Sequence, residues 1–324
     1  MKTSQLPLIN AGPLGLTLNE AQERNIDLLC QVANQNGAPI SLKEIMELTS
    51  LDTREEELLN AWNRSELLSD RYSIVGGRVI EKTAFFIETN EVRTRYDRAE
   101  SYLNHARKFS TLFKHDKDLE MLSVSGSTSY CSVSEDDDLD FFCITRNDSL
   151  WIFLSKALIR SRLFRARDKG SPVLCFSFVI EESHARKLFS KHGDGLFARD
   201  AITAIVLKGE EFYRNLLKEN KGIGSYFPKM YSARIPELSS MQPKIPKYPS
   251  QSRASIARKI ANRILQHTLG NYIRFKSNLL NRRFAKTGDN KRIFKVHVRK
   301  GCFLFESNGY LELRKKYAGL KSNS

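Results

Sequence analysis

The sequence lacks several features that would place it at once in a class of protein. It contains no run of eighteen apolar residues, so we expect no transmembrane helix. Its first residues are polar and interrupted by proline and glycine, unlike the apolar core of a signal peptide. We therefore expect a cytoplasmic protein without membrane association. The 324 residues are enough for two or three domains.

Cysteines and the common catalytic motifs are also scarce. The five cysteines are widely scattered, which predicts reduced and mostly buried thiols rather than a disulfide framework or a zinc site. The chain has no Walker A sequence and no GxGxxG fingerprint. It also has no GxSxG elbow, which argues against a serine hydrolase. The sequence HDKD at 115–118 is a candidate ligand cluster, but a polar loop at a helix end is the simpler interpretation.

Acidic residues are scarce in the last quarter of the chain. Residues 244–321 contain 20 Lys and Arg against three acids, which is +17, so with a total of +15 the rest carries −2. Nucleic acid is the obvious polyanion partner for such a basic region. A solvated helical face that keeps the protein in solution is an equally open interpretation.

The hydrophobic pattern predicts a small unit over residues 20–80. Three short helices are expected, the second capped by Ser41 with Glu44 as a capping box, followed by a hairpin turned at Gly76-Gly77. This order resembles a winged helix-turn-helix, a fold that binds DNA or docks other proteins. Three glutamates begin the third helix, and their charge would repel DNA phosphates.

Residues 82–220 are predicted to form an α/β core. The expected elements are a long helix, two strands, a crossover helix, a third strand and a further helical region, over 82–115, 119–126, 139–145, 149–167, 171–180 and 196–217 respectively. Residues 221–250 end in a proline-rich stretch and are predicted to be a linker or strap. Residues 251–324 are predicted to be a basic α-helical region.

The stretch between the first two predicted strands has the residues of a phosphate and metal site. Asp138 and Asp140 flank Leu139 where a strand begins, and residues two apart on a strand share one face. Two neighbouring carboxylates are costly unless a cation neutralises them, and Mg²⁺ prefers oxygen ligands and binds phosphates. Upstream, Gly126 permits close backbone approach and the Ser127 hydroxyl can donate to a phosphate oxygen.

These residues form the pattern Val124-Ser125-Gly126-Ser127, ten residues, then Asp138-Leu139-Asp140-Phe141. It resembles the signature of the nucleotidyltransferases of the DNA polymerase beta superfamily. The resemblance implies an α/β (α+β) fold with a small mixed-sheet core, and Mg²⁺-dependent transfer of a nucleoside monophosphate from a nucleoside triphosphate such as ATP. It also implies that Asp138 and Asp140 are the catalytic metal ligands, and that Gly126 and Ser127 bind the nucleotide.

A looser similarity covers most of residues 25–230. It is to nucleotidyltransferase-domain proteins of undefined substrate, which place a winged-helix-like segment before the core and an α-helical region after it. The acceptor of the nucleotidyl group is not specified by these motifs, nor is the oligomeric state. The basic region at 251–324 would then contact the acceptor, with RNA as one example.

One departure from the superfamily pattern concerns the third carboxylate. The superfamily usually has it on the strand after the crossover helix, where this chain has Ser177 between two phenylalanines. Glu181 has the same side-chain parity as Ser177 and is a candidate third acid, with Asp194 and Asp200 as others. The alternative function is that of a catalytically impaired nucleotidyltransferase-like protein, acting as a nucleic-acid-binding or regulatory module.

Overall fold

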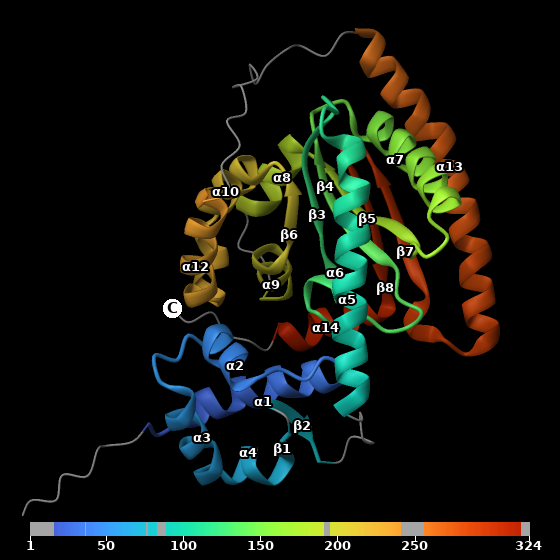
Figure 1. Ribbon diagram of the computed structural model, residues 1–324. Helices are drawn as coiled ribbons and strands as arrows, with labels where there is room; N and C mark the ends of the chain where they lie inside the picture. Colours follow the sequence, from blue (N-terminus) through green and yellow to red (C-terminus); the bar gives the residue numbers. More distant parts are fainter. Residues whose placement is uncertain are drawn as a thin grey trace, which may run out of the picture.

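The computed structural model describes residues 16–35, 37–75, 77–82, 89–190, 195–240 and 256–318. These residues form a mixed α and β structure, with a six-stranded mixed sheet at its centre and a separate two-stranded hairpin (Figure 1). This confirms the α/β (α+β) class that the sequence predicts. No helix within these ranges has the length and apolar character needed to cross a membrane.

The N-terminal unit contains four helices and a hairpin. They are α1 (Glu20–Gln35), α2 (Leu42–Thr49), α3 (Glu55–Arg64), α4 (Glu66–Arg71), β1 (Tyr72–Val75) and β2 (Arg78–Glu81). The predicted capping box forms, because the Ser41 hydroxyl accepts the Glu44 amide and the Glu44 carboxylate accepts the Ser41 amide. The predicted third helix is divided at Ser65, which ends α3 and caps α4.

The central sheet has the strand order β6-β3-β4-β5-β8-β7. Its strands are β3 (Leu119–Val124), β4 (Leu139–Thr145), β5 (Leu174–Glu181), β6 (Ile205–Lys208), β7 (Phe294–Arg299) and β8 (Cys302–Ser307). Neighbours pair antiparallel except β4 and β5, which are parallel. Their parallel pairing needs a crossover, and α7 (Leu150–Arg167) supplies it. The three predicted core strands and the crossover helix are therefore confirmed.

Helices cover both faces of this sheet (Figure 1). One face carries α5 (Thr89–Ser110), η1 (Thr111–Phe113), α7 and α13 (Ile256–Thr287), while α8 (Glu182–Ser190), α9 (Gly195–Thr203), α10 (Glu210–Glu219), α11 (Lys221–Tyr226) and α12 (Pro228–Ser240) cover the other. Side chains of β4 alternate between the two cores: Phe141 packs beneath α5 and α7, and Phe142 packs on the other face.

The predicted long helix over 82–115 is observed as α5 followed by η1. Residues 83–88 of that prediction lie outside the described ranges. The remaining short helices are α6 (Gly126–Ser129), η2 (Asn290–Arg292) and α14 (Asn308–Tyr317).

The prediction of a continuous helical region over 196–217 is wrong. The chain forms α9, then β6, then α10, because Ile205 and Val206 pair with β3 at one edge of the sheet. Gly209 follows β6 with a φ of +85°, a conformation that suits glycine and separates the strand from α10. Tertiary pairing therefore overrides the helical periodicity of this segment.

Two further predictions for the C-terminal half are also wrong. Residues 251–324 are not α-helical throughout, because β7 and β8 extend the core sheet beyond β5. β8 satisfies backbone groups that would otherwise remain at the open edge of β5, and β7 pairs with the other edge of β8. The expected linker over 221–250 is helical as far as Ser240, with Pro236 inside α12. The rest of that linker, residues 241–250, lies outside the described residues.

Candidate functional site

The turn after β3 lies against the start of β4. Gly126 begins α6 with a φ of +66°, and the Ser125 amide donates to the Asp140 carbonyl at 3.0 Å. A Cβ atom on residue 126 would lie 2.9 Å from the Asp140 Oδ2 atom. Glycine is therefore required both by the left-handed backbone and by the close approach of this carboxylate.

Asp140 is half-buried beside this turn. Burial raises the pKa of its carboxyl to about 7; hydrogen bonds from Ser177 and Cys175 oppose this shift, and the charge of Asp138 adds to it. A carboxylate beside a like charge favours either a proton or a metal cation. The predicted pair is thus brought together next to Gly126, with neutral hydrogen-bond donors behind it.

Asp138 precedes β4 and is exposed. Although the residue as a whole is exposed, partial desolvation of its carboxyl group raises its pKa, as does the charge of Asp137, while Arg165 and Arg292 oppose the shift. Arg165 belongs to the last turn of α7, and Arg292 to η2. Arg292 also forms an ion pair with Asp136 at 3.4 Å. The basic C-terminal region therefore reaches the acidic loop of the candidate site.

Ser177 lies beside Asp140, where the superfamily pattern would place a third carboxylate. In the parallel register Asp140 pairs with Cys175, and both Cys175 and Ser177 donate hydrogen bonds to the Asp140 carboxylate. Across the described ranges, no three His, Cys, Asp or Glu side chains converge as a metal-binding group. The site therefore contains two carboxylates and a serine.

Glu181 does not complete this pair, and that prediction is wrong. It pairs with Thr145 at the far end of the parallel strands, about 20 Å along β5 from the level of Asp140. Its buried carboxylate accepts hydrogen bonds from the backbone of residues 148–150 at the start of α7. Burial raises the pKa of Glu181, and these hydrogen bonds partly offset the shift. Side-chain parity identified its face, but not its distance from Asp140.

The other two acids considered for the third position do not reach it either. Asp200, on α9, accepts hydrogen bonds from the hydroxyl groups of Tyr130 and Tyr310. Asp194 lies outside the described part of the chain.

Three side chains that the sequence did not identify hold the loop between Gly126 and Asp138. Tyr102 donates to the Asp137 carbonyl at 3.1 Å, and Arg98 donates to the Val133 carbonyl at 2.9 Å. Ser132 donates to the carbonyl of Gly37 in the N-terminal unit at 3.1 Å. The sequence pattern predicted only that Arg98 and Tyr102 belong to a helix. Their hydrogen bonds could not be predicted, because the partners are backbone carbonyls 35 positions away along the chain.

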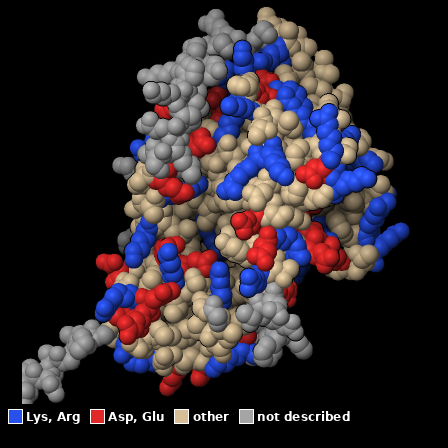
Figure 2. Space-filling model, viewed as in Figure 1, with Lys and Arg blue, Asp and Glu red and all other residues tan. Residues whose placement is uncertain are grey.

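The basic region is concentrated on α13. This 32-residue helix contains eight Lys and Arg and no acid, and it packs beside α7 on the sheet. Lys and Arg side chains gather over both helices in the surface view (Figure 2). Large apolar side chains are also exposed on α13, among them Ile256, Ile264 and Phe275.

Comparisons with protein-family models, with curated proteins and with solved structures find no match for this chain. A function for this chain therefore rests on the geometry around Gly126 and Asp140.

Proposed function

We propose that this protein is a Mg²⁺-dependent nucleotidyltransferase, which transfers a nucleoside monophosphate from a nucleoside triphosphate to an acceptor. One observation supports this most directly: the Asp140 carboxylate lies against Gly126, with Asp138 two residues away. A phosphate-binding turn and a carboxylate pair must be adjacent in such an enzyme, because the metal contacts both the protein and the triphosphate.

The donor set suits a single Mg²⁺ ion that shares its coordination shell with the substrate. Mg²⁺ is commonly held by one or two carboxylates together with phosphate oxygens and water, so a protein cage of three acids is not required. When bound, Mg²⁺ would neutralise charge that develops on the transferring phosphoryl group. Asp138 and Asp140 would hold it, and must be ionised to do so.

The other groups of the site would orient the triphosphate. Gly126 allows the backbone of the turn to approach a phosphate closely, and the Ser127 hydroxyl can donate a hydrogen bond. Arg165 and Arg292 bring positive charge toward Asp138, where it would favour a polyanionic substrate. The basic face of α7 and α13 would contact the acceptor, and a nucleic acid is the acceptor class that this charge favours.

The direct test is transfer of radioactive label from α-³²P nucleoside triphosphates, with Mg²⁺ and a panel of acceptors that includes single-stranded RNA. We expect labelled product with the wild-type chain and a loss of at least 100-fold with Asp138→Ala or Asp140→Ala. Glu135→Ala is the matched control, since this exposed acid of the same loop should leave transfer unchanged. Equal activity in the wild type and both aspartate variants would contradict the proposal.

The second candidate is a catalytically impaired nucleotidyltransferase-like protein that binds nucleic acid or regulates a partner. Ser177 at the third-carboxylate position favours it, as does the absence of acids from α13. Fluorescence anisotropy with a labelled single-stranded RNA separates the two candidates. RNA binding that persists in Asp138→Ala/Asp140→Ala, in a chain that transfers no nucleotide, would support this second function.

A further inference from the structure

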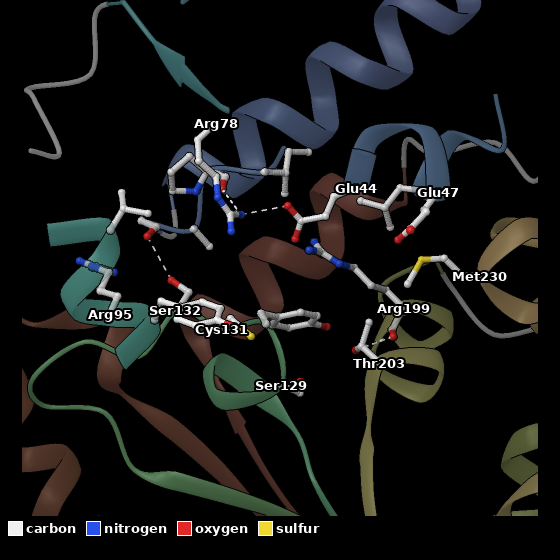
Figure 3. A pocket seen from close by; sticks show the side chains of 18 residues that line it. Glu44, Glu47, Arg78, Arg95, Ser129, Cys131, Ser132, Arg199, Thr203 and Met230 are labelled. Carbon is white, nitrogen blue, oxygen red and sulfur yellow. Dashed lines mark hydrogen bonds and ion pairs between the residues drawn. The ribbon is translucent and has the colours of Figure 1, made fainter. Parts of the chain in front are cut away.

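A cavity of about 120 Å³ lies between the N-terminal unit and the core, beside residues 129–132 (Figure 3). The N-terminal unit contributes the backbone of residues 37–40 together with Glu44, Glu47 and Arg78. The core contributes Arg95 from α5, residues 129–132 after the turn, and Arg199 from α9. Charged side chains from both units therefore line one partly open cavity.

Two of the three arginines in this cavity are paired with carboxylates. Arg78 forms an ion pair with Glu44 at 2.9 Å and also donates to the Pro39 carbonyl. Arg95 forms an ion pair with Glu91 at 2.7 Å. Their positive charges are therefore balanced by the protein itself.

Arg199 is not balanced in this way. Its guanidinium group lies 4.4 Å from the centre of the Tyr130 ring and donates to the Tyr317 hydroxyl. Its Nε atom is buried without a hydrogen-bond partner, and Arg199 has no ion pair among the described residues. The neighbouring acid, Asp200, acts on Arg199 electrostatically, but in the described part of the chain its carboxylate accepts hydrogen bonds from tyrosine hydroxyls and forms no ion pair with the guanidinium. Figure 3 shows Arg199 extending across the cavity toward Glu44.

A guanidinium group in this setting is suited to an anion. Arg199 is half-buried and forms no ion pair among the described residues, so an oxyanion would supply the countercharge that its guanidinium lacks. The planar guanidinium matches the geometry of phosphate and carboxylate oxygens. Tyr130 and Tyr317 hold the group in place, so little conformational entropy would be lost on binding.

We propose that this cavity is a binding site for a small oxyanion, the phosphate or carboxylate group of a small ligand, with Arg199 as its principal donor. Glu47 faces the same cavity and opposes anion binding electrostatically, so it limits the charge that the site accepts. This site is separate from the Asp138/Asp140 pair, and its existence does not depend on nucleotidyl transfer.

The position of the cavity couples an occupant to the candidate active site. Residues 129–132 form one wall, and only Thr128 separates them from Gly126 and Ser127 along the chain. Ser132 also donates to the Gly37 carbonyl at 3.1 Å, across the same junction. An anion held by Arg199 would therefore stabilise the contact between the N-terminal unit and the segment that carries the phosphate-binding turn.

Cys131 provides a local measurement of occupancy. It lines the cavity and is exposed, whereas the other four free cysteines are buried or half-buried. The full-length chain is treated with N-ethylmaleimide, with inorganic phosphate or acetate up to 10 mM at constant ionic strength, and each cysteine is followed by mass spectrometry. We expect at least one of these anions to slow modification of Cys131 at least fivefold, with the other cysteines unchanged.

Matched variants then assign the effect to the cavity. Arg199→Gln should abolish the protection, whereas Arg186→Gln, which removes a surface arginine from α8, should retain it. Glu47→Gln removes the opposing charge and should lower the anion concentration for half-protection at least threefold. It also tests the site if Arg199→Gln does not fold. Unchanged Cys131 modification in the wild type, or equal protection in Arg199→Gln, would overturn the proposal.

Discussion

Two Asp-x-Asp sequences lie at the starts of neighbouring strands of the same sheet. The carboxylates of the first form ion pairs with Lys and Arg side chains, and those of the second form none within the described ranges. Asp116-Lys117-Asp118 precedes β3, and Asp138-Leu139-Asp140 leads into β4. Each places two carboxylates near the start of a strand. The comparison shows that spacing alone does not distinguish a structural acid pair from a candidate metal site.

The first pair is neutralised by cations of the protein. Asp116 and Asp118 side chains are only 2% and 10% exposed, and Lys156 contacts them at 2.6 and 2.7 Å. Arg160 and Arg258 add ion pairs to Asp116 and Asp118, each at 3.0 Å. Burial would raise the pKa of Asp116, but hydrogen bonds from Lys156 and from the Asp118 amide outweigh it, so the pKa is lowered.

The second pair has no such ion pair in the described chain. Ser177 and Cys175 donate to Asp140 without supplying charge, and the pKa of Asp140 is raised to about 7 by burial. Arg165 and Arg292 act on Asp138 electrostatically, whereas the carboxylate of this loop that Arg292 contacts as an ion pair is Asp136. The Asp116/Asp118 pair is therefore neutralised within the fold, whereas the Asp138/Asp140 pair is not, and our proposal assigns a Mg²⁺ ion to it.

Removing one member of the neutralised pair should have the largest effect on stability. Asp116→Ala removes the partner that Lys156 and Arg160 share. Because Lys156 keeps Asp118 and both cations are partly exposed, we expect a cost of about 3 kcal/mol, the low end for breaking a buried pair. Urea denaturation of the purified chain measures this change in the free energy of unfolding. Asp136→Ala is the matched control, because its carboxylate is exposed and its removal should cost less than about 0.5 kcal/mol. Equal costs would remove the distinction between buried and exposed acids.

Asp140→Asn should have the next largest effect, with the opposite sign. Because the folded pKa of Asp140 lies above its usual 3.8, the folded chain binds this proton more tightly, and stability falls as pH rises from about 4 to about 7. Asparagine should remove this part of the pH dependence and stabilise the protein at pH 8 by about 1–3 kcal/mol. Thermal unfolding from pH 5 to pH 8 measures it. A variant less stable than the wild type at pH 8 would contradict this interpretation.

The lowered pKa of Asp116 predicts a different pH window. Its stabilising contribution is present above the unfolded pKa near 3.8 and is lost as the pH falls below about 4. Asp116 should therefore affect stability below about pH 4, and Asp140 should affect it between about pH 4 and pH 7. One measurement of stability against pH separates the two contributions.

Mg²⁺ should act on the second pair alone. At ten times its Kd it should stabilise the wild-type chain by about 1.4 kcal/mol, through binding to the folded state only. Thermal unfolding at pH 8, with and without MgCl₂, should show this gain in the wild type and lose it in Asp140→Asn. A gain of the same size in Asp140→Asn would place the Mg²⁺ elsewhere.

Ser177→Asp should give the smallest change in stability, and it tests directly whether a third carboxylate beside Asp140 strengthens Mg²⁺ binding. A third carboxylate beside Asp140 adds like charge, so we expect a loss of about 1 kcal/mol at pH 8 without metal. Added Mg²⁺ should recover this loss, and its Kd should fall several-fold relative to the wild type. Ser177→Asn is the matched control, because it adds bulk without charge. A metal-independent loss of equal size in both variants would indicate a steric effect.

Much of the local structure could be read from the sequence because it depends on neighbours along the chain. The Ser41 capping box needs only residues three apart, and the hairpin of β1 and β2 needs a short turn with glycine. The adjacency of Gly126 and Asp140 follows from one antiparallel pairing, β3 with β4, which the connection over residues 125–138 joins. Periodicity also predicted the crossover helix and the three strands around it.

The mistakes arise where distant segments decide the structure. The segment around Ile205 has a helical pattern but forms a strand, because it pairs with β3. The basic C-terminal region forms β7 and β8, because the edge of β5 is open for pairing. Glu181 was a reasonable third acid by parity, yet strand register places it at the other end of β5. The alternation of side chains along a strand determines which face of the sheet a residue is on, whereas the register between strands determines its position along the sheet.

The sequence by itself determined the α/β class, the glycine turn and the carboxylate pair that follows it, because these depend on short-range spacing and hydrophobic periodicity. Tertiary structure alone decided the roles of the two Asp-x-Asp sequences. The cations that neutralise Asp116 and Asp118 come from α7 and α13, and the serine beside Asp140 comes from β5. Electrostatic pairing depends on distance in space, which spacing along the chain does not encode for segments far apart.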